Sequence, residues 1–177
     1  MAIDRRAALI GGAALLVSVP LALPSAGRAS QGARYVSAAR ATDGSYQVVF
    51  LDAKGVVERV IPLSARGHDV AISPDARTAV AFARRPGDFA VVIDLIGAAE
   101  PRIFTASAGR HFYGHGVFSA DGHLLFATEN DYEAARGVLG VYDVEVGFRR
   151  VGELPTHGVG PHEVLMMPDG VTLCVAN

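Results

Sequence analysis

A repeat of 47 residues constrains the fold of this chain more than any other feature of its sequence. His68, His115 and His162 recur at this interval, and each is followed by an apolar run, a turn and a second apolar run. Each turn also carries an aspartate: Asp75, Asp121 and Asp169. Self-similarity at a period of about 40–50 residues is typical of β-propellers and solenoids. The repeat therefore indicates the architecture before it says anything about the chemistry.

Each repeat is predicted to contain four short strands separated by turns. In the repeat that begins at His68, apolar runs bounded by turn residues predict strands at 68–73, 78–83, 89–95 and 102–105. The following repeat predicts strands at 115–119, 124–128, 138–143 and 148–152. Four antiparallel strands in a repeat of this length form one propeller blade. Because no window shows a sustained helical pattern with caps, the mature chain is predicted to be all-β.

The predicted blades are incomplete at both ends of the sequence. Runs at 35–40, 45–52 and 57–63 match the second, third and fourth strands of a blade, so this blade lacks an inner strand. Closed propellers commonly complete one blade with strands from both termini, because closure removes exposed sheet edges. With blade breaks near 66, 113 and 160, residues 30–177 supply about three blades, whereas propellers have at least about four. We expect the sequence to be a fragment of a seven-bladed propeller. Closure by oligomerisation is the alternative.

The first 29 residues are predicted to be a twin-arginine signal peptide. The pair Arg5 and Arg6 is followed by an apolar stretch at 7–23, and the small-x-small pattern Gly27-Arg28-Ala29 favours cleavage after Ala29. An uncleaved membrane anchor is the alternative, although Pro20 within the apolar stretch and Pro24 directly after it weaken a membrane span. We therefore expect the mature protein to be periplasmic, with no membrane contact beyond export.

The composition limits the classes of partner and of covalent link. The formal net charge is −2, so neither nucleic acid nor an anionic membrane is expected as a partner. Cys174 is the only cysteine, so no disulfide can form within the chain. Its apolar setting, LCVA, predicts a buried and unreactive thiol. Stability is therefore expected to come from packing.

Several segments closely resemble a known family, in the same order along the chain. They are DRRA near the start, YVSAAR, RGHDVAISP, AFARRPGDFAVVIDL, GRHFYGHGVFSADG, ATENDYEAARGVLGVYD and HGVGPHEV. Over essentially all of residues 30–177 the chain is similar to exported bacterial β-propellers that are classed as a domain of unknown function. The resemblance implies a seven-bladed, periplasmic propeller of the Tyr-Val-Thr-Asn-repeat type. Genes of this family often lie beside those of imelysin-like periplasmic iron-uptake proteins and cytochrome-like oxidoreductases, which implies proximity to iron handling but no established activity.

The recurring histidines are candidates for a metal site. The inner strand of each blade lines the central channel, so His68, His115 and His162 are expected to lie near one another at one rim. Converging imidazoles are suitable ligands for a divalent transition metal. The alternative is structural, since in WD-type blades a Gly-His pair braces its own blade, and Gly67-His68 and Gly114-His115 have this form. The sequence leaves both interpretations open.

Neighbouring residues extend the candidate site. His111 brings a second imidazole, and Tyr113 a phenol, to the segment before His115. Glu163 directly follows His162 and is a candidate carboxylate partner, although neighbours on a strand face opposite sides. Tyr113 and Glu163 are therefore predicted to support the ligands from outside the coordination sphere. The predicted ligands of a transition metal are His68, His111, His115 and His162.

Other polar segments favour simpler roles. The acidic segment Glu129–Glu133 offers oxygen ligands for calcium but lacks the spacing of a calcium loop, so a solvated loop is predicted. Arg84 and Arg85 are candidates to pair with it, and His123 in its turn is expected to be solvated. The sequence contains no Ser-His-Asp order, G-x-S-x-G elbow, C-x-x-C-H haem attachment or glycine-rich phosphate loop.

The sequence therefore predicts a periplasmic β-propeller that acts as a binding or scaffold module. Metal or iron handling is the suggested role, and the expected partner is a metal, a small ligand or a periplasmic protein. The alternative is an enzyme at the channel mouth, either a metal-dependent, lactonase-like hydrolase or a redox enzyme. Non-catalytic binding is favoured because nothing in the sequence commits the chain to covalent catalysis.

Overall fold

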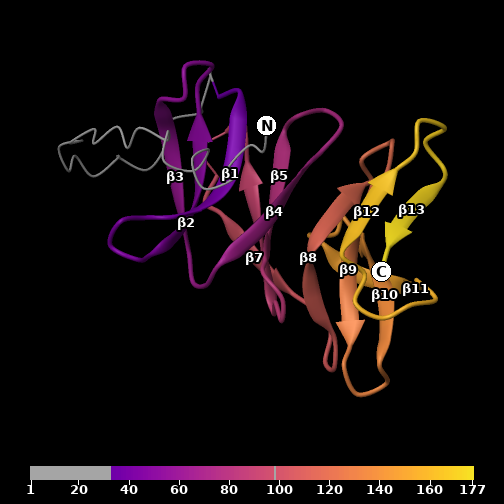
Figure 1. Cartoon of the computed structure of the whole chain (residues 1–177). Helices are drawn as coiled ribbons and strands as arrows, with labels where there is room; N and C mark the ends of the chain where they lie inside the picture. The colour runs from indigo at the N-terminus through magenta and orange to yellow at the C-terminus, as the bar shows by residue number, and fades with distance from the viewer. Residues whose placement is uncertain (1–32, 98) are drawn as a thin grey trace, which may run out of the picture.

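Thirteen β-strands in four antiparallel sheets make up the part of the chain that the structure describes (Figure 1). This computed structural model describes residues 33–97 and 99–177, so the predicted signal peptide at 1–29 lies outside it. Within these two ranges no residue is helical, and no helix is therefore long and apolar enough to cross a membrane. The prediction of an all-β chain is confirmed.

Within each sheet the strands are neighbours in sequence order. The first sheet contains β1 (Tyr35–Arg40), β2 (Tyr46–Leu51) and β3 (Val57–Leu63). The second contains β4 (Gly67–Ile72), β5 (Thr78–Ala83), β6 (Phe89–Asp94) and β7 (Arg102–Thr105). The third contains β8 (His111–Phe118), β9 (Leu124–Asp131), β10 (Arg136–Asp143) and β11 (Arg149–Pro155). The last pairs β12 (Glu163–Met166) with β13 (Leu173–Ala176).

These sheets are the blades of a partial β-propeller. Figure 1 shows them side by side, and the inner strand β8 contacts both β4 and β12. The chain passes from one blade to the next at residues 64–66, 106–110 and 156–162. The second of these passages ends at residue 110, before the blade break predicted near residue 113. His111 and Phe112 already belong to the third blade, because they pair with β9. The predicted architecture of four-stranded blades is confirmed for the second and third sheets, and among the described residues the first has three strands and the last has two.

The recurring aspartates stabilise the turn between the first two strands of each blade. Ser73 donates a hydrogen bond from its hydroxyl to Asp75 (2.6 Å), and Ser119 donates one to Asp121 over the same distance. In the last blade the hydroxyl of Thr172 donates to Asp169 at 2.6 Å. Short polar side chains that bond to nearby groups in this way favour turns. The aspartate repeat therefore has a structural explanation.

β5 is buried on both faces, which explains its run of small and apolar residues. Ala79 and Ala81 pack in a cluster with Phe50 of the first blade. Val80 and Phe82, which point the other way, pack with aromatic residues of the third blade. Burying a side chain as large as Phe82 contributes about 1.5–3 kcal/mol. The second blade is thus held by the blades on either side of it, which fixes the position of its inner strand β4.

The acidic segment is not the solvated loop that its composition predicts. β9 continues to Asp131 and β10 begins at Arg136, so only residues 132–135 connect them. Glu129 is fully buried and Asp131 is nearly so. Their carboxylates are paired with arginines (see below) rather than free for a calcium ion. The apolar periodicity did not predict this extension of β9, because a run of charged residues in a strand has the composition of a loop.

Two smaller predictions are also corrected. Arg85 does not pair with the acidic segment, because it donates a hydrogen bond to the Tyr113 hydroxyl at 2.8 Å and lies over that ring at 4.9 Å. Cys174 is exposed rather than buried. It lies on β13, which among the described strands pairs only with β12.

Candidate functional site

Irregularities in two inner strands orient the histidines. The register of β4 against β5 shifts between Gly67 and Val70, and that of β8 against β9 shifts between Phe112 and Gly116. His68 and His115 lie within these shifts. A bulge turns a side chain away from the direction that regular alternation would give, and bulges are common beside binding sites. The third histidine, His162, directly precedes β12.

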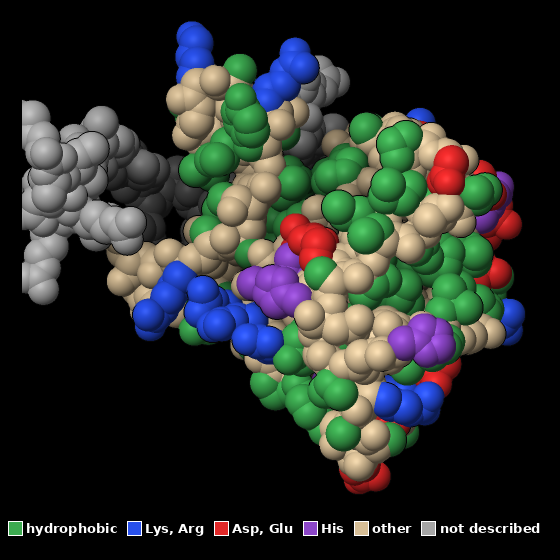
Figure 2. Space-filling model, turned by 45° about the vertical axis from the view of Figure 1, so that its right-hand side comes forward, with side chains coloured by type: hydrophobic (Ala, Val, Ile, Leu, Met, Phe, Trp, Pro, Cys, Tyr) green, Lys and Arg blue, Asp and Glu red, His purple; other side chains and the backbone are tan. Residues whose placement is uncertain are grey.

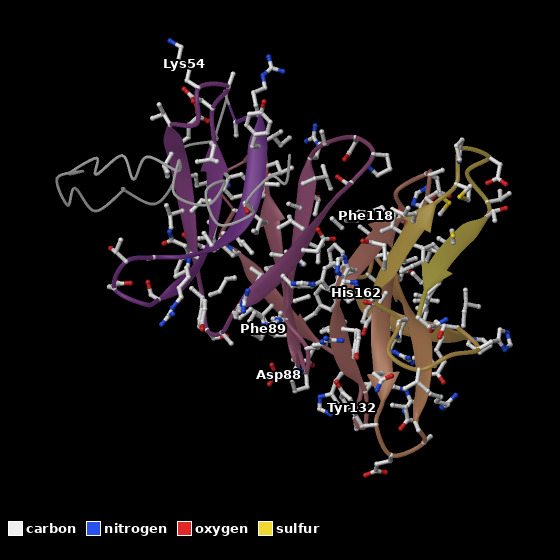
Figure 3. All side chains as sticks on the ribbon, in the orientation of Figure 1. Lys54, Asp88, Phe89, Phe118, Tyr132 and His162 are labelled. Carbon is white, nitrogen blue, oxygen red and sulfur yellow. The ribbon has the colours of Figure 1, made fainter. Side chains whose placement is uncertain are left out.

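The three repeated histidines converge at the centre of the fan of blades. One nitrogen from each of His68, His115 and His162 lies within 4.8 Å of those of the other two. Their ring centroids are 4.7, 4.8 and 5.7 Å apart. Figure 3 shows His162 next to β8, and Figure 2 shows histidines beside a carboxylate in the middle of one face. The predicted convergence of the three inner strands is therefore present in the geometry.

His115 is the buried member of this group, which we call the histidine cluster. Its side chain is only 12% exposed, whereas His68 and His162 are exposed. Its Nδ1 faces two carboxylates, with Glu163 Oε2 at 3.3 Å and Asp69 Oδ2 at 3.6 Å. Neither ring nitrogen makes a hydrogen bond within the described residues. A buried imidazole with an unused nitrogen is the arrangement expected at a ligand site.

The neighbours of the cluster shift its pKa values in opposite directions. The Asp69 carboxylate raises the pKa of His115 against the effect of burial, and Glu163 adds to the rise. Burial and the two other imidazoles lower the pKa of His68. His115 therefore holds a proton to a higher pH than a free histidine does, while His68 loses its proton early. Metals and protons compete for these imidazoles, because a ligand nitrogen must be deprotonated.

Gly114 makes room for His68. Its φ of +115° belongs to a region that essentially only glycine adopts, and a Cβ there would lie 2.5 Å from Cδ2 of His68. We expect Gly114→Ala to cost about 1–3 kcal/mol of folding free energy and to displace the His68 ring. Thermal unfolding and the NMR signals of the His68 ring measure the two effects. Gly109→Ala is the control, because Gly109 also has a positive φ (+74°) but nothing within 4 Å. Equal effects on His68 in both variants would contradict this packing role.

The other predicted site residues lie apart from the histidine cluster. The His111 ring lies tilted against Tyr132, with 5.3 Å between ring centroids, and Figure 3 shows Tyr132 far from His162. Tyr113 accepts the hydrogen bond from Arg85. The structure therefore brings three of the four predicted ligands together, and Glu163 joins them.

Asp69 is a site residue that sequence reasoning missed. Regular alternation predicts that Asp69 points away from His68, but the bulge in β4 brings its carboxylate toward His115 on the next blade. A carboxylate directly after each of two repeated histidines, Asp69 and Glu163, was the available signal. The alternation that made Glu163 doubtful on a regular strand applies equally to Asp69.

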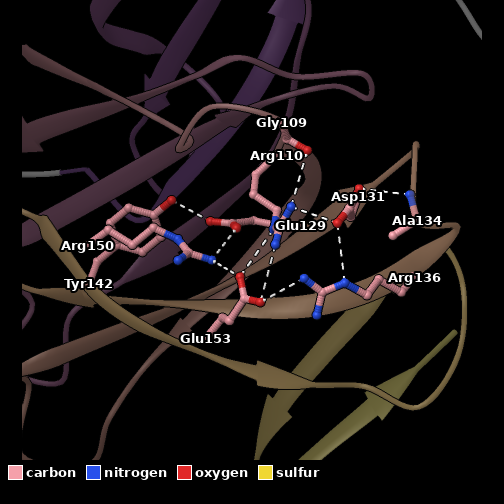
Figure 4. A network of polar contacts seen from close by, with 9 residues as sticks. All are labelled: Gly109, Arg110, Glu129, Asp131, Ala134, Arg136, Tyr142, Arg150 and Glu153. Carbon is pink, nitrogen blue, oxygen red and sulfur yellow. Dashed lines mark hydrogen bonds and ion pairs between the residues drawn. The ribbon is translucent and has the colours of Figure 1, made fainter.

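A second polar network lies in the third blade and is structural (Figure 4). The buried carboxylate of Glu129 accepts a hydrogen bond from the Tyr142 hydroxyl and pairs with Arg150 at 3.0 Å. Arg150 also pairs with Glu153 at 2.8 Å. Two further arginines complete the network, because Arg110 and Arg136 each pair with both Asp131 and Glu153. Every carboxylate in this network has a cationic partner.

The charges of this network stabilise one another. Arg110 and Arg150 lower the pKa of Glu153 to about 2. Burial and Glu129 raise the pKa of Tyr142, so its hydroxyl remains a donor at neutral pH. Although burial opposes it, the pairing with Glu129 and Glu153 raises the pKa of Arg150. The network thus clamps β9, β10 and β11 and leaves no carboxylate free for a ligand.

Comparison with known proteins places the chain in a family. The model of a family described as protein of unknown function DUF1513 matches residues 61–177. The chain belongs to this family. No curated protein matches it. The resemblance seen in the sequence to a domain of unknown function is therefore confirmed, and the family carries no activity that transfers to the histidine cluster.

Solved structures share the fold. Hydrazine synthase of Kuenenia stuttgartiensis is similar with a TM-score of 0.60 and 19% identity, over 81% of this chain and 41% of that one. A candidate 6-phosphogluconolactonase of Bacteroides uniformis is similar with a TM-score of 0.60 and 15% identity, over 80% and 47%. The chain thus spans less than half the length of either. At these identities the likeness shows a common fold.

Proposed function

We propose that this protein is a periplasmic propeller that binds a divalent transition metal at His68, His115 and His162. The observation that carries the proposal is the meeting of three imidazoles from three successive blades within 4.8 Å. Histidines that only brace their own blades have no reason to point at one another. Imidazole donors suit zinc, iron, copper and nickel.

The histidine cluster fits an ion after its rings close in. A metal–nitrogen bond is about 2.0–2.1 Å, so two nitrogens on one tetrahedral ion lie about 3.4 Å apart. The longest separation in the histidine cluster, 4.8 Å, exceeds this by about 1.4 Å. His68 and His162 are exposed and can turn inward around the buried His115.

The carboxylates beside His115 strengthen the proposal. Metal-bound histidines usually direct their other ring nitrogen to a carboxylate, which fixes the ring and increases its basicity. Asp69 and Glu163 both face Nδ1, which leaves Nε2 for the ion. Three neutral imidazoles, a divalent cation and two carboxylates would together carry no net charge. The arrangement therefore does not require an uncompensated charge at the centre of the molecule.

The biological setting forms part of the same proposal. The twin-arginine signal, the seven-bladed form and the association with iron-uptake genes are expectations from the sequence and its resemblance. A metal site at the hub of an exported propeller fits a role in periplasmic metal or iron handling, as a binding or scaffold module.

A second candidate is a hydrolase at the channel mouth. Two of the three proposed ligands are exposed, so a bound ion would keep a position open to water. Three histidines with an open position are the ligand set of several catalytic zinc sites. The fold likeness to a candidate lactonase supports trying lactones first. Lactone hydrolysis by the metal-loaded protein that chelation abolishes would favour this candidate over a binding module.

The test of the metal site uses NMR of the histidine rings. The chain has six histidines, and zinc added to the metal-free mature protein is expected to shift the ring signals of His68, His115 and His162 at one equivalent. The signals of His111, His123 and His157 are expected to stay. The variants His123→Ala and His157→Ala assign two of the unshifted signals. Shifts spread over all six histidines, or none at one equivalent, would overturn the proposal.

A further inference from the structure

The strand that carries His115 contains two more residues than its neighbour at the level of the histidine cluster. The pairing of β8 with β9 breaks off after Phe112 and resumes at Gly116. Only one residue of β9, Thr128, lies between the partners of these two residues. Residues 113–115 of β8 therefore face a single residue of β9. Because buried backbone groups that lose their ladder partners must bond elsewhere, a bulge of this width needs another source of hydrogen bonds.

The side chain of Thr128 supplies hydrogen bonds to this bulge. The backbone N–H of His115 donates to the Thr128 hydroxyl oxygen at 3.2 Å, and that hydroxyl donates to the His115 carbonyl at 3.1 Å. Thr128 has no exposed surface, and within the described residues its hydroxyl has no other partner. Since a hydroxyl group can donate and accept at the same time, one side chain satisfies both backbone groups of His115.

The second blade packs against the bulge on both sides of His115. Gly114 lies against the ring of His68. Gly116 lies in the same way against the ring of Phe82, and at either glycine a Cβ would overlap the ring that it faces. The backbone of His115 is therefore confined by packing from the second blade and by hydrogen bonds from β9.

Among the two bulged inner strands, only that of the third blade is held by a hydroxyl. In the second blade the corresponding bulge, at His68 and Asp69, faces Phe82, which has no hydrogen-bonding side chain. His68 is exposed and can turn in solvent, whereas His115 is the buried imidazole. The fold thus holds most firmly the ring around which the other two have to close.

We propose that Thr128 is a positioning residue of the metal site, which holds the backbone of His115 so that its imidazole is directed at His68 and His162. The inference rests on the proposed function, because it explains how the buried ligand is kept in place for the ion. The direction of a side chain on a bulge follows from the local backbone, so a hydroxyl that fixes both backbone groups of His115 also fixes its Cα–Cβ bond. A ligand that is already in place loses little conformational freedom when the metal binds, which favours affinity.

The first experiment tests the orientation of His115 without metal. Thr128→Val removes the hydroxyl and keeps the branched shape, and Thr128→Ser and Thr128→Ala form a second pair that differs by the hydroxyl alone. The rings of His115 and His68, whose centroids are 4.7 Å apart, are expected to give nuclear Overhauser contacts in the metal-free mature protein. These contacts should persist in Thr128→Ser and be lost in Thr128→Val and Thr128→Ala, because the unpaired backbone groups of His115 move toward other partners. Contacts of equal strength in the parent and all three variants would refute the positioning role.

The second experiment measures zinc affinity by competition with an indicator dye, at a temperature where every variant is folded. We expect Thr128→Val to bind zinc about 10–100-fold more weakly than the parent, as is usual when a residue that orients a metal ligand is removed, and Thr128→Ser to stay within about threefold. Tyr142→Phe is the matched control, because it also removes a buried hydroxyl from the third blade, one that donates to Glu129 rather than to His115. Its zinc affinity should equal that of the parent. An equal loss of affinity in Thr128→Val and Tyr142→Phe would mean that affinity only follows stability, and the proposal would be wrong.

The two experiments separate this inference from the proposed function. If the parent protein binds no zinc but the ring contacts are still lost in Thr128→Val, the metal site fails and the orienting role of Thr128 stands. If the parent binds zinc and Thr128→Val binds it equally tightly, the metal site stands and the positioning role is excluded. If Thr128→Val does not fold, the affinities of Thr128→Ser and Thr128→Ala decide, and equal affinities for this pair exclude the role.

Discussion

Replacing Arg150 by methionine is expected to lower the free energy of unfolding by about 3–5 kcal/mol, because it leaves a buried carboxylate without its cation. Glu129 has no exposed surface, and Arg150 is its only cationic partner among the described residues. Burying an unpaired charge is costly even when the lost pair itself contributed little. Single domains have about 5–15 kcal/mol of stability in total, so this variant should melt far below the parent protein.

The control for this prediction lies next to it in the sequence. Arg149 is exposed on the same strand, and Arg149→Met should change the free energy of unfolding by no more than about 0.5 kcal/mol. Urea unfolding of both variants measures the difference. Adding Glu129→Gln to Arg150→Met should recover part of the loss, because no charge is then buried unpaired while Tyr142 keeps an acceptor. A double variant less stable than Arg150→Met alone would contradict this account.

The acid side of the stability profile follows from the same network. Arg110 and Arg150 lower the pKa of Glu153 to about 2, below its ordinary value of 4.5. A carboxyl with a lowered pKa in the folded state contributes stability above its unfolded pKa, and that contribution is lost as the pH falls through the folded pKa. The network therefore weakens between about pH 4.5 and pH 2.

The repeat made most of the fold predictable from the sequence. β1, β3, β5 and β7 have the predicted bounds, because turn residues mark both ends of each apolar run. The predicted strand bounds were wrong for β8 and β9, where charged or polar residues are buried within a strand. His111 and Phe112 pair with Asn130 and Glu129, which extends β8 and β9 through residues that looked like loop. Alternation cannot identify such a strand, since its polar residues are satisfied by arginines that lie far along the sequence.

The candidate site was predictable only in part, for a geometric reason. The period of the repeat carries His68, His115 and His162 to equivalent places on adjacent inner strands, and the structure brings them together. Spacing within one strand was a poor guide: His111 lies four residues from His115 yet contacts Tyr132 instead. The bulges in β4 and β8 orient the histidines and also Asp69. The apolar pattern of the sequence does not predict where these bulges lie.

Replacing His115 by alanine is expected to weaken metal binding by more than about 100-fold, since even partners outside the coordination sphere cost 10–100-fold. The buried imidazole is the fixed point around which the exposed His68 and His162 close. His123→Ala is the control, because His123 is exposed and pairs only with Glu145 at 3.0 Å among the described residues. Competition with a zinc indicator dye measures both affinities.

Stability should respond to His115→Ala much less than metal affinity does, and in a pH-dependent way. Asp69 raises the pKa of His115 in the folded state, so protonated His115 stabilises the fold below its unfolded pKa of about 6.5. That contribution is lost as the pH rises through the folded pKa. Once the ring is neutral, its nitrogens have no hydrogen-bond partner among the described residues, and removing it relieves an unsatisfied group. The variant should therefore be less stable than the parent at pH 5.5, and the difference should shrink as the pH rises through the folded pKa of His115.

Metal binding by the parent protein should show the opposite dependence on pH. The ion needs deprotonated imidazoles, so the metal affinity falls as the pH drops below the raised pKa of His115. Because this pKa is raised, metal binding should still release a proton from His115 at a pH just above the pKa of free histidine. Calorimetry in buffers of different ionisation enthalpy counts these protons. If His115→Ala lowers the melting temperature as much at pH 8 as at pH 5.5 and leaves zinc affinity unchanged, His115 braces its blade and the metal site is wrong. A large loss of affinity with little change in melting at pH 8 separates ligation from bracing.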